Sequence, residues 1–155
     1  IPPLRYELVH RLKHEFPELT IAINGGFTTD EQVAAQLQEL DGVMVGRAAY
    51  HHPWWLASWD ASFYGQPGPA ESRQAVEARM VEYMEREARQ GVHWHSIARH
   101  MMGLYDGIPG ARRWRQVWSD HRLKHLPPAE VMALAHDATR HATEPAGMTQ
   151  ESEHS

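Results

Sequence analysis

Two glycine-containing segments have residue types and spacing that suit ligand binding. The first, "INGG", ends with Asn24, Gly25 and Gly26 directly after an apolar run, and the second pairs Gly46 with Arg47 after another. Glycine at the carboxyl end of a strand lets the backbone approach a ligand closely, and a following helix adds the positive end of its dipole. Arginine adds a forked cation that matches phosphate oxygens. The pattern favours a bound phosphate, although such glycine pairs also occur in ordinary turns.

Each glycine segment lies between a predicted strand and a predicted helix. The runs "LTIAI" and "GVMVG" are short and free of charge, which is typical of strands buried on both faces of a parallel sheet. Helical spacing predicts one helix over residues 4–16 and a second one after Gly26, where Thr28 and Glu31 match a capping box. The order helix, strand, helix, strand predicts two parallel β/α units.

Two parallel strands leave both edges of their sheet unpaired, so they need further strands. Either the chain assembles with other copies, or the strands belong to a larger α/β domain. The chain opens at Ile1 and not at methionine, which favours a segment that starts within a longer protein. In a (β/α)8 barrel, a phosphate site is commonly built by the loops that follow the last two strands, and the two glycine segments here fit that position.

The second half of the sequence is predicted to be helical. After "GQPGP" a helix over residues 71–89 carries an apolar stripe at Val76, Met80, Met84 and Ala88, with charges of both signs on what we expect to be a solvated face. Three shorter helices are expected, at about residues 93–104, 111–122 and 128–141. The polar tail, 143–155, is predicted to be disordered.

Composition limits the possible environments and partners. The chain has no cysteine, which excludes disulfides and thiolate nucleophiles and fits a cytoplasmic protein. No secretory leader or membrane-spanning run is visible in the sequence. The net charge of −5 argues mildly against nucleic acid, yet residues 91–125 carry six arginines or lysines against two aspartates, a local balance of +4.

The cluster "RRWR" is the second candidate site. Arg112 and Arg115 lie three residues apart and share a helix face, whereas Trp114 and Trp118 are expected to face the core. Arginines on such a face can simply point to solvent. They can also contact phosphates and stack on the exposed bases of a folded RNA.

Histidines and the aromatic segment "HHPWW" suggest no further site. The pairs His10/His14 and His121/His125 have a spacing that can bind metal, but neither has a nearby acidic or cysteine ligand in a known pattern, so no metal is expected. We interpret "HHPWW" as packing between the two halves of the chain and not as a stacking platform.

Three segments together resemble a known family. "INGG", "DGVMVGRAAYHHPW" and "GLYDGIPGARRWRQVWSD" are similar to the C-terminal half of bacterial tRNA-dihydrouridine synthases of the A subfamily, and the resemblance extends from Ile1 to about residue 142. It implies an FMN-binding (β/α)8 barrel followed by a helical domain, and the reduction of D-loop uridines in tRNA with NADPH.

The resemblance also assigns roles to individual residues. It implies that the FMN phosphate is held by Asn24, Gly25, Gly26, Gly46 and Arg47. It implies that tRNA is contacted by Arg112 and Arg115. The family's proton-donating cysteine and its flavin-ring contacts belong to the first half of the barrel, so no catalytic residue is expected in this chain. The N-terminal part of the barrel is its expected partner, and the isolated chain is expected to be inactive.

The predicted fold is therefore α/β plus all-α. Residues 1–66 are assigned to the last two β/α units of an incomplete FMN-binding TIM barrel, residues 67–142 to a helical-bundle domain that binds tRNA, and residues 143–155 to the tail. Two alternatives remain open. One is an RNA-binding helical module without redox activity, and the other is a phosphate- or FMN-binding barrel enzyme that acts on a small metabolite.

Overall fold

The computed structural model describes residues 3–68 and 72–143. The chain divides into two compact units, Ile1–Ala70 and Glu71–Ser155, and each is described by itself. The predicted disordered tail falls outside the described residues except for Thr143, the last residue of the final helix. Within the described ranges, no helix combines the length and apolar character needed to cross a membrane.

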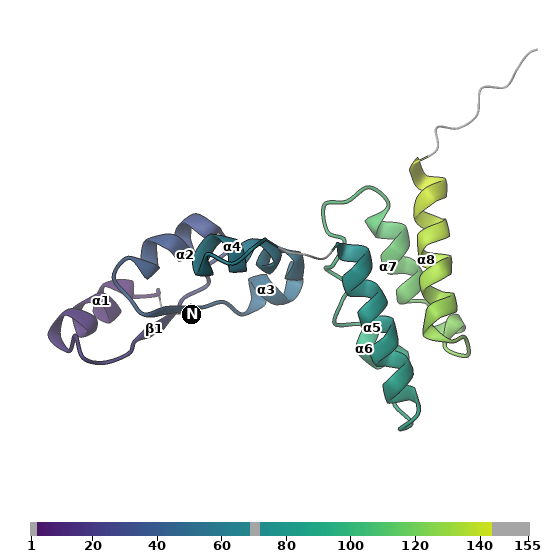
Figure 1. Cartoon of the computed structure of the whole chain (residues 1–155), viewed down its shortest axis with the longest axis horizontal. Coiled ribbons are helices and arrows are strands. Elements are labelled where there is room, and N and C mark those ends of the chain that lie inside the picture. Colours follow the sequence, from purple (N-terminus) through teal and green to yellow (C-terminus); the bar gives the residue numbers. More distant parts are fainter. Residues whose placement is uncertain (1–2, 69–71, 144–155) are drawn as a thin grey trace, which may run out of the picture. The chain divides into compact units, whose positions relative to one another are not determined.

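The first unit begins with the predicted alternation of helices and strands (Figure 1). Helix α1 (Tyr6–Glu15) precedes strand β1 (Ala22–Asn24), and helix α2 (Asp30–Leu37) precedes strand β2 (Gly42–Met44). The strands pair in parallel, with Ala22 opposite Gly42 and Asn24 opposite Met44. The predicted order and the predicted parallel pairing are confirmed.

The remainder of the first unit is a series of short helices rich in aromatic residues. Helix α3 (Arg47–His51) follows β2, then the 3-10 helix η1 (Pro53–Ser58) and helix α4 (Trp59–Tyr64). Gly65 ends α4 in the left-handed conformation, at a φ of 62°, which glycine adopts without steric cost.

The core of the first unit is small. Its buried residues are Ile23, Phe27, Val33 and Leu40, while α1 has no buried residue at all. The prediction that both strands are buried on both faces is wrong for the sheet that this chain forms, since Ile23 is buried but its neighbours in β1 are exposed. Two strands alone cannot cover each other's edges and faces.

The cap of α2 lies one residue beyond the predicted position. Thr29, not Thr28, is the N-cap, and its hydroxyl accepts a hydrogen bond from the backbone N–H of Gln32. The Gln32 side chain in turn accepts one from the backbone N–H of Thr28, at 2.8 Å. Gln32 therefore takes the place that the sequence pattern gave to Glu31.

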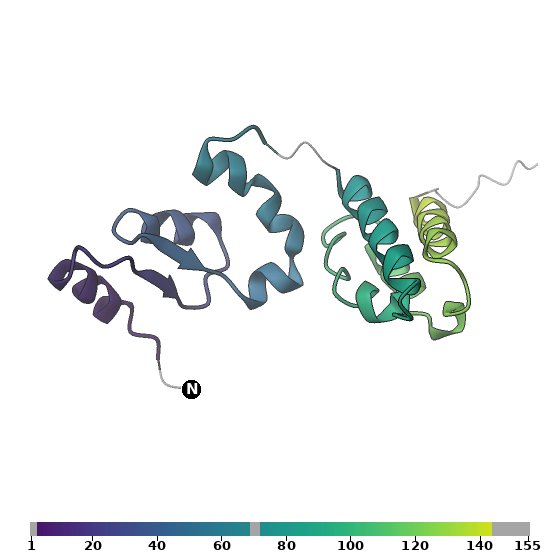
Figure 2. The same ribbon diagram turned by 60° about the horizontal axis from the view of Figure 1, so that its bottom comes forward.

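The described part of the second unit consists of helices and turns (Figures 1 and 2). Its elements in chain order are α5 (Arg73–Ala88), α6 (Trp94–Ala98), α7 (Ala111–Trp118), η2 (His121–Leu123) and α8 (Pro128–Thr143). Helix α7 packs along α8, and α5 contacts both α6 and α8.

Two helices in this unit are shorter than predicted. Helix α6 ends at Ala98, and turns follow up to Gly110, with Gly107 and Gly110 at φ values of 76° and 85°. Helix α7 ends at Trp118, and a separate 3-10 turn follows. Neither helix ends at a glycine, since the residues that follow them are Arg99 and Ser119.

The buried face of α5 also differs from the prediction. Its buried residues are Glu77, Val81 and Met84, whereas Ala88 is exposed. Around this face lies a core of tryptophans, aliphatic residues and methionines: Trp94, Ala98, Met101, Leu104, Tyr105, Ala111, Trp114, Trp118, Val131 and Ala135. A carboxylate therefore lies at the centre of an otherwise apolar core.

Candidate functional site

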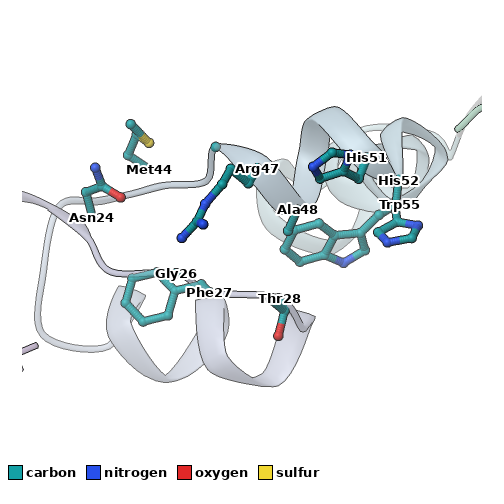
Figure 3. A pocket seen from close by; sticks show the side chains of 11 residues that line it. Asn24, Gly26, Phe27, Thr28, Met44, Arg47, Ala48, His51, His52 and Trp55 are labelled. Carbon is teal, nitrogen blue, oxygen red and sulfur yellow. The ribbon is translucent and has the colours of Figure 1, made fainter. Parts of the chain in front are cut away.

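A cavity of about 810 Å³ lies at the ends of β1 and β2 in the first unit. Its lining residues come from three places: the segment after β1, the segment after β2, and the start of the aromatic helices (Figure 3). They are Asn24, Gly26, Phe27, Thr28, Met44, Gly46, Arg47, Ala48, His51, His52 and Trp55. Both predicted glycine segments therefore face one space.

The parallel register explains this convergence. Asn24 is paired with Met44, so the residues that follow each strand leave the sheet side by side. Figure 3 shows Arg47 pointing from the start of α3 into the space between the two strand ends. Four of the five predicted phosphate contacts, Asn24, Gly26, Gly46 and Arg47, line the cavity.

The fifth, Gly25, is placed differently. Its carbonyl accepts a hydrogen bond from the Tyr6 hydroxyl, and a Cβ at this position would lie 2.2 Å from Tyr6 Cε1. The Tyr6 ring itself stacks on Phe27, with ring centroids 5.4 Å apart. The close approach of the Tyr6 ring therefore favours glycine at position 25, whatever the ligand.

Gly26 has the opposite environment. Its φ is 71°, and a Cβ would meet no atom within 4 Å. The left-handed conformation favours glycine here, and the open space leaves the backbone accessible from the cavity. Glycine is therefore favoured at the two consecutive positions for different reasons. At position 25 the Tyr6 ring of α1 leaves no room for a side chain, and at position 26 the backbone is left-handed and borders the cavity.

Sequence reasoning missed the aromatic side of the cavity. His51, His52 and Trp55 line it at the end away from Asn24 (Figure 3). The indole N–H groups of Trp55 and Trp59 both donate to Asp30 Oδ1, at 2.8 and 2.9 Å. The segment "HHPWW" thus has contacts inside the first unit, and the i, i+4 spacing of the two tryptophans was the available signal.

The cavity has the polar character of an anion site. Arg47 forms no ion pair within the described residues, and no acidic residue is among those that line the cavity. Asp30, which bonds to Trp55 of the lining, accepts from two indoles. A guanidinium, glycine backbone and an aromatic wall can together bind a phosphate attached to a larger apolar group.

The two predicted tRNA contacts lie on α7 and differ from each other. Arg112 is exposed. Arg115 is partly buried, and its Nη1 donates to Asp106 Oδ1 at 2.7 Å, so the turn before α7 fixes its direction. Gly110 caps α7, and a Cβ there would lie 3.0 Å from Thr139 Cβ, so α8 passes close to the start of α7.

Beneath α7 lies the buried carboxylate of Glu77, which has four hydrogen-bond partners. Its Oε1 accepts from the indoles of Trp114 and Trp118, at 2.8 and 2.9 Å. Its Oε2 bonds to the Tyr105 hydroxyl at 2.8 Å and to His136 Nε2 at 2.7 Å. Burial, and then the bond to Glu77, raises the pKa of Tyr105, which keeps the phenol a donor.

This arrangement confirms that Trp114 and Trp118 face the core, with 1% and 2% of their surfaces exposed. The predicted solvated face of helix 71–89 is present, since Glu82, Glu85 and Arg86 are exposed, but Glu77 departs from it and is fully buried. The described residues contain no group of three or more acidic, histidine or cysteine side chains that could hold a metal. His10, from a predicted pair, bonds instead to Glu39 and Gln36, at 3.0 and 2.9 Å.

Comparison with known proteins gives consistent matches. Residues 1–142 match the family described as dihydrouridine synthase (Dus). A tRNA-dihydrouridine(20/20a) synthase of Escherichia coli K12 is 46% identical over 88% of this chain, which covers 39% of that relative. The proteins of the same name from Shewanella oneidensis and Pseudomonas aeruginosa are both 44% identical, over 90% and 87% of this chain, with 42% and 41% of each relative covered.

The chain thus spans about two fifths of the length of the curated relatives that it matches. Within that span, the family match includes both glycine segments and the arginines of α7. The match covers nearly the whole chain, and this protein therefore belongs to the dihydrouridine synthase family.

Proposed function

We propose that this chain provides the FMN-phosphate anchor and a tRNA-binding unit of a tRNA-dihydrouridine synthase that uses NADPH. The observation that supports it most is the convergence of both strand ends and Arg47 on one cavity, in a member of this family. The names of the relatives indicate uridines 20 and 20a of tRNA as the substrate positions. The remaining strands of the barrel are supplied by sequence outside this chain.

The residues around the cavity fit the phosphate of FMN. Arg47 would neutralise its charge, and the backbone at Gly26 and Gly46 would come close to its oxygens, because Gly26 has no atom near the position of a Cβ. Asn24 would add a side-chain amide from the end of β1. Gly25 would act indirectly, by allowing Tyr6 to hold the segment.

Bound FMN supplies hydride transfer, and the role of this chain is to hold the cofactor and the RNA. The chain has no cysteine, so the thiol that donates a proton in this family would come from another part of the protein. We therefore expect no uridine reduction by this chain alone.

The α7 arginines would hold the RNA in two ways. Arg112 is exposed and free to reach a phosphate, while Arg115 is directed by Asp106 and keeps further N–H groups for a second contact. The net positive charge of residues 91–125 adds attraction to the phosphate backbone.

The FMN assignment can be tested with two flavins. Wild-type chain should bind FMN more tightly than riboflavin, which lacks the phosphate, and Arg47→Ala should remove most of that preference. A charged hydrogen bond contributes about 1.5–3 kcal/mol, so FMN affinity should fall roughly 10- to 150-fold. Flavin fluorescence titration measures both affinities, and Arg11→Ala, on exposed α1 residue Arg11, serves as a charge-matched control. Equal affinity of the wild-type chain for both flavins would contradict the phosphate site.

The tRNA assignment needs a separate titration. Arg112→Ala should weaken tRNA binding, whereas Arg113→Ala, its exposed neighbour on another face of α7, should change it less. A second candidate function, an RNA-binding unit without redox chemistry, is favoured by the missing cysteine. It predicts tRNA binding without any flavin binding. A metabolite enzyme would bind the flavin and be indifferent to tRNA.

A further inference from the structure

A second cavity, of about 380 Å³, lies in the second unit beside α6 and the C-terminal end of α7. Trp94 and Trp118 form an apolar wall, with their rings in an edge-to-face contact at 5.6 Å. His95, Arg99 and His121 form the polar wall. The candidate contacts on α7 do not line this cavity.

The groups around this cavity are mostly cationic or able to become so. The His95 ring stacks on His93, with centroids 5.6 Å apart, and meets His121 edge-on at 6.1 Å. Burial is the main cause that lowers the pKa of His95, and the positive charges of Lys124, the two neighbouring histidines and Arg99 lower it further. Four groups that can carry positive charge therefore act on one ring.

One acidic side chain, Asp120, also lines the cavity. Its carboxylate is already occupied by Arg122, through the guanidinium at 2.7 Å and the backbone N–H at 2.9 Å. These bonds hold the pKa of Asp120 at about 2. The pair is neutral as a whole, so it does not compensate the positive charge of Arg99 in the cavity wall or of Lys124 nearby.

His95 also has an unsatisfied polar atom. Its Nδ1 is buried and has no hydrogen-bond partner among the described residues. An unpaired buried polar atom costs about 1–3 kcal/mol, and native structures retain few of them. An anion beside the ring would relieve the mutual repulsion and favour the protonated imidazole, in which both nitrogens donate.

We propose that this cavity is a phosphate subsite for the backbone of a structured RNA, with Arg99 as the permanent charge in its wall, Lys124 as a nearby positive charge outside it, and His95 as a protonatable contact. The proposal rests on the RNA-binding function proposed for the second unit. Arg112 lies on α7 and Ser119, seven residues later, directly follows this helix, which corresponds to about 10 Å along a helix. The cavity and the α7 arginines would therefore hold different phosphates of one RNA.

The first test is the salt dependence of tRNA binding by the whole chain. Arg99→Ala should weaken binding roughly tenfold at low salt and reduce the slope of log K against log salt by about 0.7–0.9, the value for one lost phosphate contact. Arg86→Ala, on the exposed surface of α5, removes an equal charge and should leave the slope unchanged. An unchanged slope in Arg99→Ala, with weaker binding in Arg112→Ala, overturns the subsite and leaves the proposed function intact.

The second test uses inorganic phosphate and histidine-ring NMR, and it distinguishes the sources of phosphate. Phosphate should raise the pKa of His95 in the wild-type chain, and tRNA should compete with it. A response to phosphate without any tRNA effect in Arg99→Ala would overturn the RNA assignment in favour of a free phosphate ligand. No response of His95 to either ligand overturns the site. Failure of the wild-type chain to bind tRNA at all, by contrast, would contradict the proposed function itself.

Discussion

The buried centre of the second unit and the strand-end cavity of the first use their polar groups in opposite ways. In the second unit, Glu77 is fully buried and each of its carboxylate oxygens has two hydrogen-bond partners. In the first unit, the cavity at the strand ends contains Arg47 without an ion pair among the described residues, and Gly26, where an added Cβ would meet no atom within 4 Å. Satisfied polar groups stabilise a fold, whereas those that a fold leaves unpaired are available to a ligand.

The second unit is also more tightly packed around its polar centre than the first unit is around its sheet. Helix α1 buries no residue, and the sheet beside it has only two strands. Around Glu77, two tryptophans, a tyrosine and a histidine close over one side chain. Substitutions at the Glu77 centre should therefore change stability first, and substitutions at the strand-end cavity should change ligand binding first.

The largest expected effect is at Glu77. Glu77→Ala removes both carboxylate oxygens from four hydrogen-bond partners and leaves a cavity, so the free energy of unfolding of the second unit should fall by about 3–5 kcal/mol. Hydrogen exchange of the α7 and α8 amides reports this unit separately from the first. Flavin affinity of any folded protein should stay unchanged.

Two further variants separate charge from shape at this position. Glu77→Gln retains an oxygen for the two indoles and presents N–H groups that the Tyr105 hydroxyl and a neutral His136 can accept, so it should cost only about 1–2 kcal/mol. Glu82→Gln, at an exposed position of the same helix, should cost less than about 0.5 kcal/mol. Equal losses in all three variants would refute the central role of the carboxylate.

A smaller effect is expected at the paired glycines of the first unit. Gly25→Ala should lower the stability of that unit by about 1–3 kcal/mol, because its methyl group would collide with the Tyr6 ring. Gly26→Ala meets no neighbouring atom, so only the cost of its left-handed backbone applies, about 1 kcal/mol. It should instead weaken FMN binding, since its methyl group would lie in the cavity.

Chemical denaturation and flavin titration measure the two glycine variants. The loss in Gly25→Ala should be much smaller when Tyr6→Ala is also present, since the collision is then removed. Fully additive losses would show that Tyr6 is not the reason for glycine at position 25.

The smallest expected effect is a pH dependence of the second unit. The pKa of His95 is lowered in the folded chain, so the unfolded state binds more protons just below the ordinary histidine pKa of about 6.5. The free energy of unfolding should therefore fall as the pH decreases through that value. Denaturation in phosphate-free buffer should show a flatter profile in His95→Gln and an unchanged one in His125→Gln. Added phosphate should also flatten the wild-type profile, and a profile insensitive to His95 would contradict the burial of its ring.

Local sequence patterns predicted a good part of this protein. Short apolar runs predicted β1 and β2, and helical spacing predicted α1, α2 and α5. The two glycine segments after the strands predicted four residues that line one cavity. These features depend on residues that are close in the chain, because strand and helix periods repeat over a few residues. The segments that resemble the family are also short, so they too can be identified from residues that are close in the chain.

Only the tertiary structure decided which side chains meet. Glu77 bonds to residues that lie 28, 37, 41 and 59 positions away in the sequence, and Asp30 to tryptophans 25 and 29 positions away. The separate roles of Gly25 and Gly26, and the pairing of Arg115 with Asp106, were equally hidden. A glutamate in a charged helix has the same local pattern whether it faces solvent or a core. Its environment is fixed by where the other helices pack, which no short segment of sequence specifies.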